Sequence, residues 1–77
     1  MSQVWKEGLR VVAVSEELRA FVKVGGVGHI RSGEWFGEET NGVAEADGEP
    51  ILNIKWRDEP HAALWCYAKH VIPAPEN

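Results

Sequence analysis

The residues best equipped for chemistry in this chain are one cysteine, Cys66, and three histidines, His29, His61 and His70. Cysteine and histidine are the usual ligands of tetrahedral zinc, so four such side chains are one way to build a metal site. Only Cys66 and His70 have a suggestive spacing, and no Cys-x-x-Cys or His-x-x-x-His pair supports them. The sequence therefore predicts no metal and no other cofactor.

Nucleophilic catalysis by Cys66 with His70 is disfavoured as well. The strand pattern around Cys66 turns its thiol toward apolar neighbours, and burial raises a thiol pKa and so removes the thiolate nucleophile. The carboxylates are numerous and lie in one polar segment, which is typical of a solvated surface rather than of an acid/base pair. We therefore expect a protein that is not an enzyme.

Four aromatic residues are better candidates for a functional contact. Trp65 and Tyr67 lie two positions apart in an expected strand, so their rings project from the same face. Trp35 and Phe36 are adjacent, so at least one of them turns outward in an extended chain. Because protein interfaces are enriched in such rings, we predict all four as partner-binding residues. The alternative is that a small domain buries them to complete its core.

Charge is distributed unevenly along the chain. Residues 32–50 contain six acidic side chains and no Lys or Arg, a local charge of about −6. The remaining residues carry eight basic and six acidic side chains, or about +2, which together give the net charge of −4. An acidic segment beside exposed aromatic rings favours a partner protein with a basic surface, and it repels nucleic acid wherever the two would face each other.

Length and composition indicate one small domain over residues 1–77, with loose ends at 1–7 and 74–77. A hydrophobic content of 44% with four tryptophans is sufficient for one core, and a single cysteine excludes an internal disulfide. No apolar run approaches the length of a membrane span, and the first residues contain no apolar signal region. Cytoplasmic localisation is the expectation that follows.

The elements that must position these residues are short strands. Period-two alternation and β-branched residues predict strands over 9–15, 27–31, 51–56, 62–67 and 71–73, with one helical turn over 67–70. Residues 15–23 fit either a short helix capped by Ser15 or an irregular excursion anchored by Leu18 and Phe21. Residues 37–50 are rich in turn-forming residues and predict a long acidic surface loop.

The glycines between Gly25 and Gly28 predict a sharp turn into a strand that something approaches closely. About five short strands with a long excursion after the first, and one helical turn before the last, resemble the SH3-like small β-barrels. The Gly-x-x-Gly-x-Ile element from Gly25 to Ile30 is similar to that of KOW-type barrels, whose glycines permit a bend at a barrel corner. The resemblance implies an all-β SH3-like barrel of about five strands, of a layout that also occurs in Tudor-like modules and small accessory subunits.

Three functions fit this resemblance. The first is a non-enzymatic protein-interaction module or accessory subunit that binds through Trp35, Phe36, Trp65 and Tyr67, with the acidic loop steering a basic partner. The second is a KOW-like or Tudor-like nucleic-acid-binding barrel that uses basic residues on the less acidic side, namely Arg10, Lys23, Arg31, Lys55 and Arg57. The third is a small oligomeric enzyme similar to type II dihydrofolate reductases, although their Val-Gln-Ile-Tyr motif is absent at 64–67.

Overall fold

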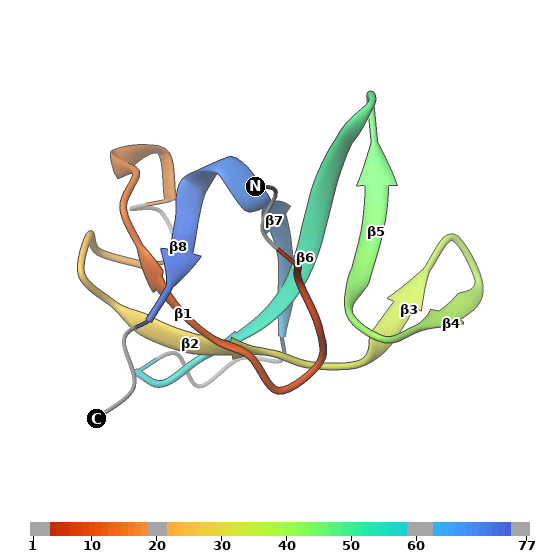
Figure 1. Cartoon of the computed structure of the whole chain (residues 1–77), viewed down its shortest axis with the longest axis horizontal. Coiled ribbons are helices and arrows are strands. Elements are labelled where there is room, and N and C mark those ends of the chain that lie inside the picture. The colour runs from red at the N-terminus through yellow and green to blue at the C-terminus, as the bar shows by residue number, and fades with distance from the viewer. Residues whose placement is uncertain (1–3, 19–21, 59–62, 75–77) are drawn as a thin grey trace.

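The computed structural model describes residues 4–18, 22–58 and 63–74, which form an all-β protein of antiparallel strands (Figure 1). The strands are β1 (Arg10–Ala13), β2 (Val27–Ile30), β3 (Gly33–Trp35), β4 (Glu38–Thr40), β5 (Val43–Ala46), β6 (Glu49–Trp56), β7 (Leu64–Tyr67) and β8 (Val71–Pro73). Two single 3-10 turns, η1 (Glu16–Leu18) and η2 (Ala68–His70), complete the described elements. The predicted all-β class is confirmed. Within these residues no helix has the length and apolar character needed to cross a membrane.

The strands are divided between a large sheet and a small one. Six strands share the large sheet, in which β5, β6, β2, β1 and β8 follow one another and β7 pairs with β6. β3 and β4 pair only with each other. β6 is the longest strand, and its first half pairs with β5 and its second half with β2. The β5–β6 hairpin is therefore continuous with the body of the molecule, whereas the β3–β4 hairpin extends from it (Figure 1).

The core consists of the inward side chains of the large sheet. The largest fully buried residues are Ile30, Leu52, Ile54 and Val11. The alternation predicted for β1 is confirmed, because Val11 is buried while Arg10 is exposed. In β6, Leu52 and Ile54 are buried as that alternation requires, but Asn53 between them is buried as well. Burying aliphatic side chains is the main favourable contribution to folding in a domain of this size.

The glycine run before β2 has the predicted roles. Gly25 adopts a φ of +93°, a conformation that side-chain-bearing residues rarely take, and its amide donates a hydrogen bond to the Ala13 carbonyl at 2.8 Å. A Cβ atom at Gly28 would lie 2.7 Å from Ile54 Cγ2 and 2.9 Å from Trp56 Cε3. Only glycine at position 28 therefore lets β6 pack this closely against β2.

The prediction of a long acidic loop over 37–50 is corrected by the structure. Two strands, β4 and β5, and the start of β6 lie within that segment. The turn at 36–37 joins β3 to β4, and the turn at 47–48 joins β5 to β6. Turn-forming residues are frequent there because two hairpins need two tight turns, and the alternation of so few apolar residues was too weak to reveal the strands.

The described start of the segment over 15–23 contains η1, a single 3-10 turn whose last residue, Leu18, is buried. Phe21, the second predicted anchor of this segment, lies outside the described residues, as does His61. At the N-terminal end, Trp5 is partly buried against the core, so packing begins within the end predicted to be loose.

Candidate functional site

Three of the four predicted partner-binding residues come together at the β3–β4 hairpin. The Trp35 and Phe36 rings meet edge to face with their centroids 4.8 Å apart, and the Trp65 ring lies 5.1 Å from that of Trp35. Trp35 and Trp65 are half-buried, whereas Phe36 is 88% exposed. We refer to Trp35, Phe36 and Trp65 as the aromatic cluster. Residues 30 positions apart in sequence thus form one apolar surface with a fully exposed tip.

The turn at the tip of this hairpin contains a residue that such turns disfavour. Trp35 pairs with Glu38, which leaves Phe36 and Gly37 as a two-residue turn with φ values of +52° and +81°. Positive φ at both central positions is the mark of a type I′ turn, which favours Asn, Asp or Gly. A phenylalanine in this left-handed conformation costs on the order of 1–2 kcal/mol, because its Cβ crowds the neighbouring carbonyl.

Polar contacts fix the base of the hairpin to the sheet. The Asn53 Nδ2 amide donates hydrogen bonds to the carbonyls of Arg31 at 3.0 Å and Ser32 at 3.2 Å, where the chain leaves β2 for β3. The Trp65 indole Nε1 donates to the Glu34 carbonyl at 3.2 Å. Trp65 is therefore part of the apolar surface and also an anchor for the strand that carries Trp35.

Thr40 closes the other end of the hairpin. Its hydroxyl donates to the Gly33 carbonyl at 2.8 Å and accepts a hydrogen bond from the Gly42 amide at 3.0 Å. Sequence reasoning missed both Thr40 and Asn53. Asn53 alternates with Leu52 and Ile54 in β6, so it points to the other face of the strand, where the hairpin base covers it to 5% exposure. An amide in the middle of an apolar strand was the available signal, because a buried amide needs hydrogen-bond partners.

Tyr67, the fourth predicted residue, lies on β7 but contacts a different group. Its hydroxyl donates to Asp47 Oδ2 at 3.2 Å, across to the tip of the β5–β6 hairpin. Lys69 Nζ lies 5.3 Å from the Tyr67 ring centroid and pairs with Glu49 at 3.6 Å. The hydrogen bond to Asp47, followed by the charge of that carboxylate, raises the pKa of Tyr67. These contacts secure the β5–β6 hairpin and do not bring Tyr67 into the aromatic cluster.

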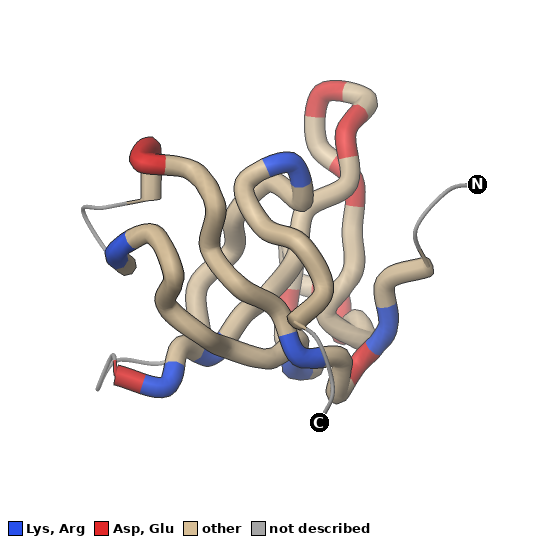
Figure 2. The backbone as a smooth tube through the Cα atoms, turned by 60° about the vertical axis from the view of Figure 1, so that its left-hand side comes forward, with Lys and Arg blue, Asp and Glu red and all other residues tan. Residues whose placement is uncertain are grey.

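Acidic side chains surround the aromatic cluster. Glu34, Glu38 and Glu39 are exposed on β3 and β4, on either side of the Phe36 turn. Figure 2 shows the acidic residues concentrated toward the hairpins, while the basic residues are spread over the rest of the chain. The hairpin therefore offers an apolar tip bordered by negative charge.

Cys66 is the most reactive of the candidate side chains by type, and the structure describes its surroundings. Burial raises the pKa of the Cys66 thiol to about 11, so the thiol is protonated at neutral pH, and its side chain packs against the core. Among residues 4–18, 22–58 and 63–74, no three His, Cys, Asp or Glu side chains are placed to hold a metal ion.

Comparison with known proteins returns no matching family model, no similar curated protein and no similar solved structure. The function of the aromatic cluster is therefore argued from its own geometry.

Proposed function

We propose that this chain is a non-enzymatic protein-interaction module that inserts Phe36 into an apolar pocket of a partner protein. The observation that carries this proposal is the exposed phenylalanine at the tip of the β3–β4 hairpin, in a backbone conformation that disfavours it. At 88% exposure, Phe36 gains little from burial that could offset this backbone cost. A residue that destabilises the isolated fold is explained if its burial in a partner contributes to the free energy of binding.

The aromatic cluster has the properties of a binding hot spot. Trp and other aromatic side chains dominate interface energies when they enter well-packed pockets. Phe36 rests edge to face on Trp35, which in turn contacts Trp65, so the tip is held by rings that are themselves half-buried. Because the turn and its supporting rings are already ordered, little conformational entropy remains to be lost on binding.

The charge around the tip defines the chemistry of the partner. Glu34, Glu38 and Glu39 would face the rim of any pocket that receives Phe36. A rim carrying Lys or Arg complements them, increases the association rate and makes that rate sensitive to salt. The partner we propose is therefore a protein with an apolar pocket and a basic rim.

The same proposal extends to the fold. We propose that the chain closes as an SH3-like barrel, in which β7, η2 and β8 complete the circuit from β6 back to β1. The pairing of β1 with both β2 and β8, and of β6 with both β2 and β7, supports this closure. In such a barrel the β3–β4 hairpin is an excursion from the body, which suits a recognition element.

An affinity comparison of matched variants tests the function. The chain and its F36N variant are immobilised, exposed to extract from cells that naturally express the chain, and the retained proteins are quantified. We expect at least one protein whose recovery falls about tenfold or more with F36N, the effect of removing a hot-spot residue.

The control is V24N, which removes an exposed apolar side chain from the turn before β2, on the side of the molecule away from the β3–β4 hairpin (Figure 1). Recovery of the partner should be unchanged by V24N. A set of retained proteins that is the same for the native chain, F36N and V24N would contradict the proposal.

A further inference from the structure

The outer face of the large sheet carries a row of aliphatic side chains. Val12 of β1 lies opposite Ile72 of β8 and also opposite Val27 of β2. Val11 and Ala13 are buried in the core, so strand alternation turns Val12 between them to the outer face. Ile72 is 50% exposed, and Val12 and Val27 are half-buried. Aliphatic residues on both faces of β1 are typical of a strand that is covered on both sides.

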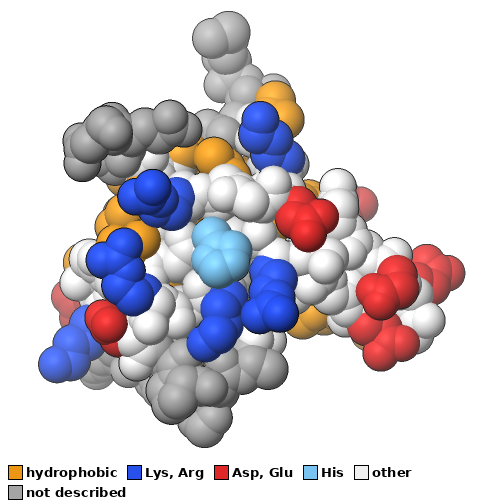
Figure 3. Space-filling view, turned by 90° about the horizontal axis from the view of Figure 1, so that it is seen from below, with side chains coloured by type: hydrophobic (Ala, Val, Ile, Leu, Met, Phe, Trp, Pro, Cys, Tyr) orange, Lys and Arg blue, Asp and Glu red, His pale blue; other side chains and the backbone are white. Residues whose placement is uncertain are grey.

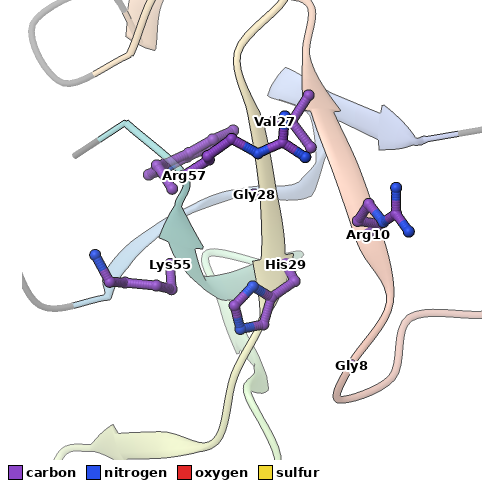
Figure 4. Close-up of a pocket in the computed structure, with 8 residues that line it drawn as sticks. Gly8, Arg10, Val27, Gly28, His29, Lys55 and Arg57 are labelled. Atoms are coloured by element: carbon purple, nitrogen blue, oxygen red, sulfur yellow. The ribbon is translucent and has the colours of Figure 1, made fainter. Parts of the chain in front are cut away.

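An open hollow lies beside Val27, where this row ends. Its volume is about 580 Å³, and its described lining residues are Gly8, Arg10, Val27, Gly28, His29, Lys55, Trp56 and Arg57. Arg10 belongs to β1 and Arg57 follows β6, so the two arginines stand on either side of β2 (Figure 4). A guanidinium group is not deprotonated in proteins, so both arginines keep their positive charge.

We refer to Val12, Val27, Ile72, Arg10 and Arg57 together as the receptor face. Figure 3 shows the side on which the hollow lies, with Lys and Arg side chains grouped around a histidine and hydrophobic side chains beside them. Several acidic side chains lie at the right-hand edge of that view. The receptor face therefore combines apolar surface with permanent positive charge, which is the chemistry that the aromatic cluster requires of a partner.

Phe36 does not meet the receptor face of its own chain. Its ring contacts Trp35 and is 88% exposed. The β3–β4 hairpin extends from the body on the side away from β1 and β8 (Figure 1). Contact between the Phe36 tip and the receptor face therefore requires two molecules.

We propose that the receptor face binds the Phe36 tip of a second copy of this chain, so that copies associate head to tail. This inference rests on the proposed function of Phe36 and identifies one partner for it. The Phe36 ring packs on the aliphatic row, and the carboxylates around it pair with the two guanidinium groups, which also stack on aromatic rings.

The charge distribution of the chain favours this arrangement. Residues 32–50, which include the tip, contain six acidic and no basic side chains, and the rest of the chain contains eight basic and six acidic ones. The tip of one copy therefore attracts the receptor face of another, whereas two tips repel each other. Because the two surfaces differ, each pair leaves one tip and one receptor face available, and further copies can add to form a ring or a filament.

Sedimentation velocity of the full chain between about 10 µM and about 1 mM tests this inference. A contact made by one hairpin tip is small, so we expect weak association that appears as a rise in average mass with concentration. F36N removes the ring and R57E reverses one charge of the receptor face, and each should weaken the association at least about tenfold.

The control is K69E, which makes the same change in net charge at a lysine that lines a different hollow. At about 0.15 M salt, where repulsion over long distances is screened, K69E should change the association by less than about twofold.

A mixture of two inactive variants locates both surfaces of the contact. F36N keeps the receptor face without the tip, and R57E keeps the tip without a working receptor face. Each variant alone should stay monomeric at a concentration where the native chain associates. An equimolar mixture should form dimers and nothing larger, because such a dimer has no competent surface left.

Four results would overturn the inference: a native chain that is monomeric at about 1 mM, F36N that associates like the native chain, equal weakening by R57E and K69E, or a mixture that stays monomeric. The extract experiment separates this failure from that of the proposed function. A protein that the native chain retains and F36N loses supports the proposed function even where the chain itself is monomeric.

Discussion

The β3–β4 and β5–β6 hairpins have the same turn geometry but different residues at the turn. The β5–β6 hairpin turns at Asp47 and Gly48, with φ values of +54° and +78°, and the β3–β4 hairpin turns at Phe36 and Gly37, with +52° and +81°. Asp-Gly is a preferred sequence for such a turn, and Phe-Gly is not. The β5–β6 turn therefore contains residues that suit its geometry. The β3–β4 turn contains Phe36, which does not suit that geometry and whose presence the proposed partner binding would explain.

The hairpins also differ in how they join the body. β5 pairs along β6 opposite Ile51 and Leu52, which are buried. β3 and β4 pair only with each other, and none of their residues is fully buried. The β5–β6 hairpin is therefore part of the main sheet and its core. The β3–β4 hairpin is held to the body by a few hydrogen bonds and ring contacts, so its sequence is less constrained by the core.

The largest expected effect is on the stability of the fold at the base of the β5–β6 hairpin. Leu52→Ala should lower the free energy of unfolding by about 2–5 kcal/mol, because it leaves a cavity in the core. Trp35→Ala, in the β3–β4 hairpin, should lower the free energy of unfolding by only about 0.5–1.5 kcal/mol through lost ring contacts. Urea denaturation measures both. Equal losses would mean that the two hairpins belong to the same core.

Exchanging the turn residues gives the next largest effect. Phe36→Asn should raise the free energy of unfolding by about 1 kcal/mol, because asparagine tolerates a positive φ that phenylalanine does not. Urea denaturation of the variant measures this gain, and the same variant should lose partner binding.

The reciprocal change, Asp47→Phe, is the matched control for that exchange. It should lower the free energy of unfolding by at least about 1–2 kcal/mol, because it imposes the unfavourable residue on the β5–β6 turn. It also removes the Asp47 carboxylate that accepts the Tyr67 hydrogen bond. A destabilised Phe36→Asn variant would show that Phe36 supports the fold and would remove the main argument for its binding role.

A smaller effect concerns the closure of the β3–β4 hairpin. Thr40→Val removes the hydroxyl that contacts Gly33 and Gly42, and should cost about 0.5–1.5 kcal/mol locally. The Gly42 amide should then exchange its hydrogen faster, as followed by NMR. Asn41→Ala, which removes one exposed contact to the Val43 amide at 3.3 Å, should change the exchange little. Similar protection of Gly42 in both variants would contradict the role assigned to Thr40.

The smallest effect is the titration of Tyr67 at the β5–β6 turn. Its pKa is raised in the folded state, so the folded state retains the phenol proton to higher pH than the unfolded state. The stability contributed by this interaction is therefore present below the ordinary tyrosine pKa of about 10 and is lost as pH rises through the folded value. Tyr67 is the only tyrosine, so tyrosinate absorbance reports it alone. Asp47→Asn should lower the midpoint, and an unchanged midpoint would exclude the contact.

Much of the sheet could be predicted because its signals are local. Period-two alternation located β1 and β6, and a glycine that cannot be replaced without collision marked β2. Residues 37–50 were misread as a loop, because β4 and β5 are only three or four residues long and present few apolar side chains. Their strand conformation depends on pairing with partners that the sequence pattern does not reveal.

The sequence by itself determined that the chain is all-β, that its core comes from alternating aliphatic residues, and that residues 32–50 carry six acidic and no basic side chains. Only the tertiary structure decided which aromatic residues meet. Trp35, Phe36 and Trp65 form one cluster and Tyr67 does not, because hairpin pairing and the hydrogen bonds of Asn53 and Trp65 fix where β3 lies against β7. Contacts between residues distant in sequence depend on strand register, and register is set by the packing of the whole sheet.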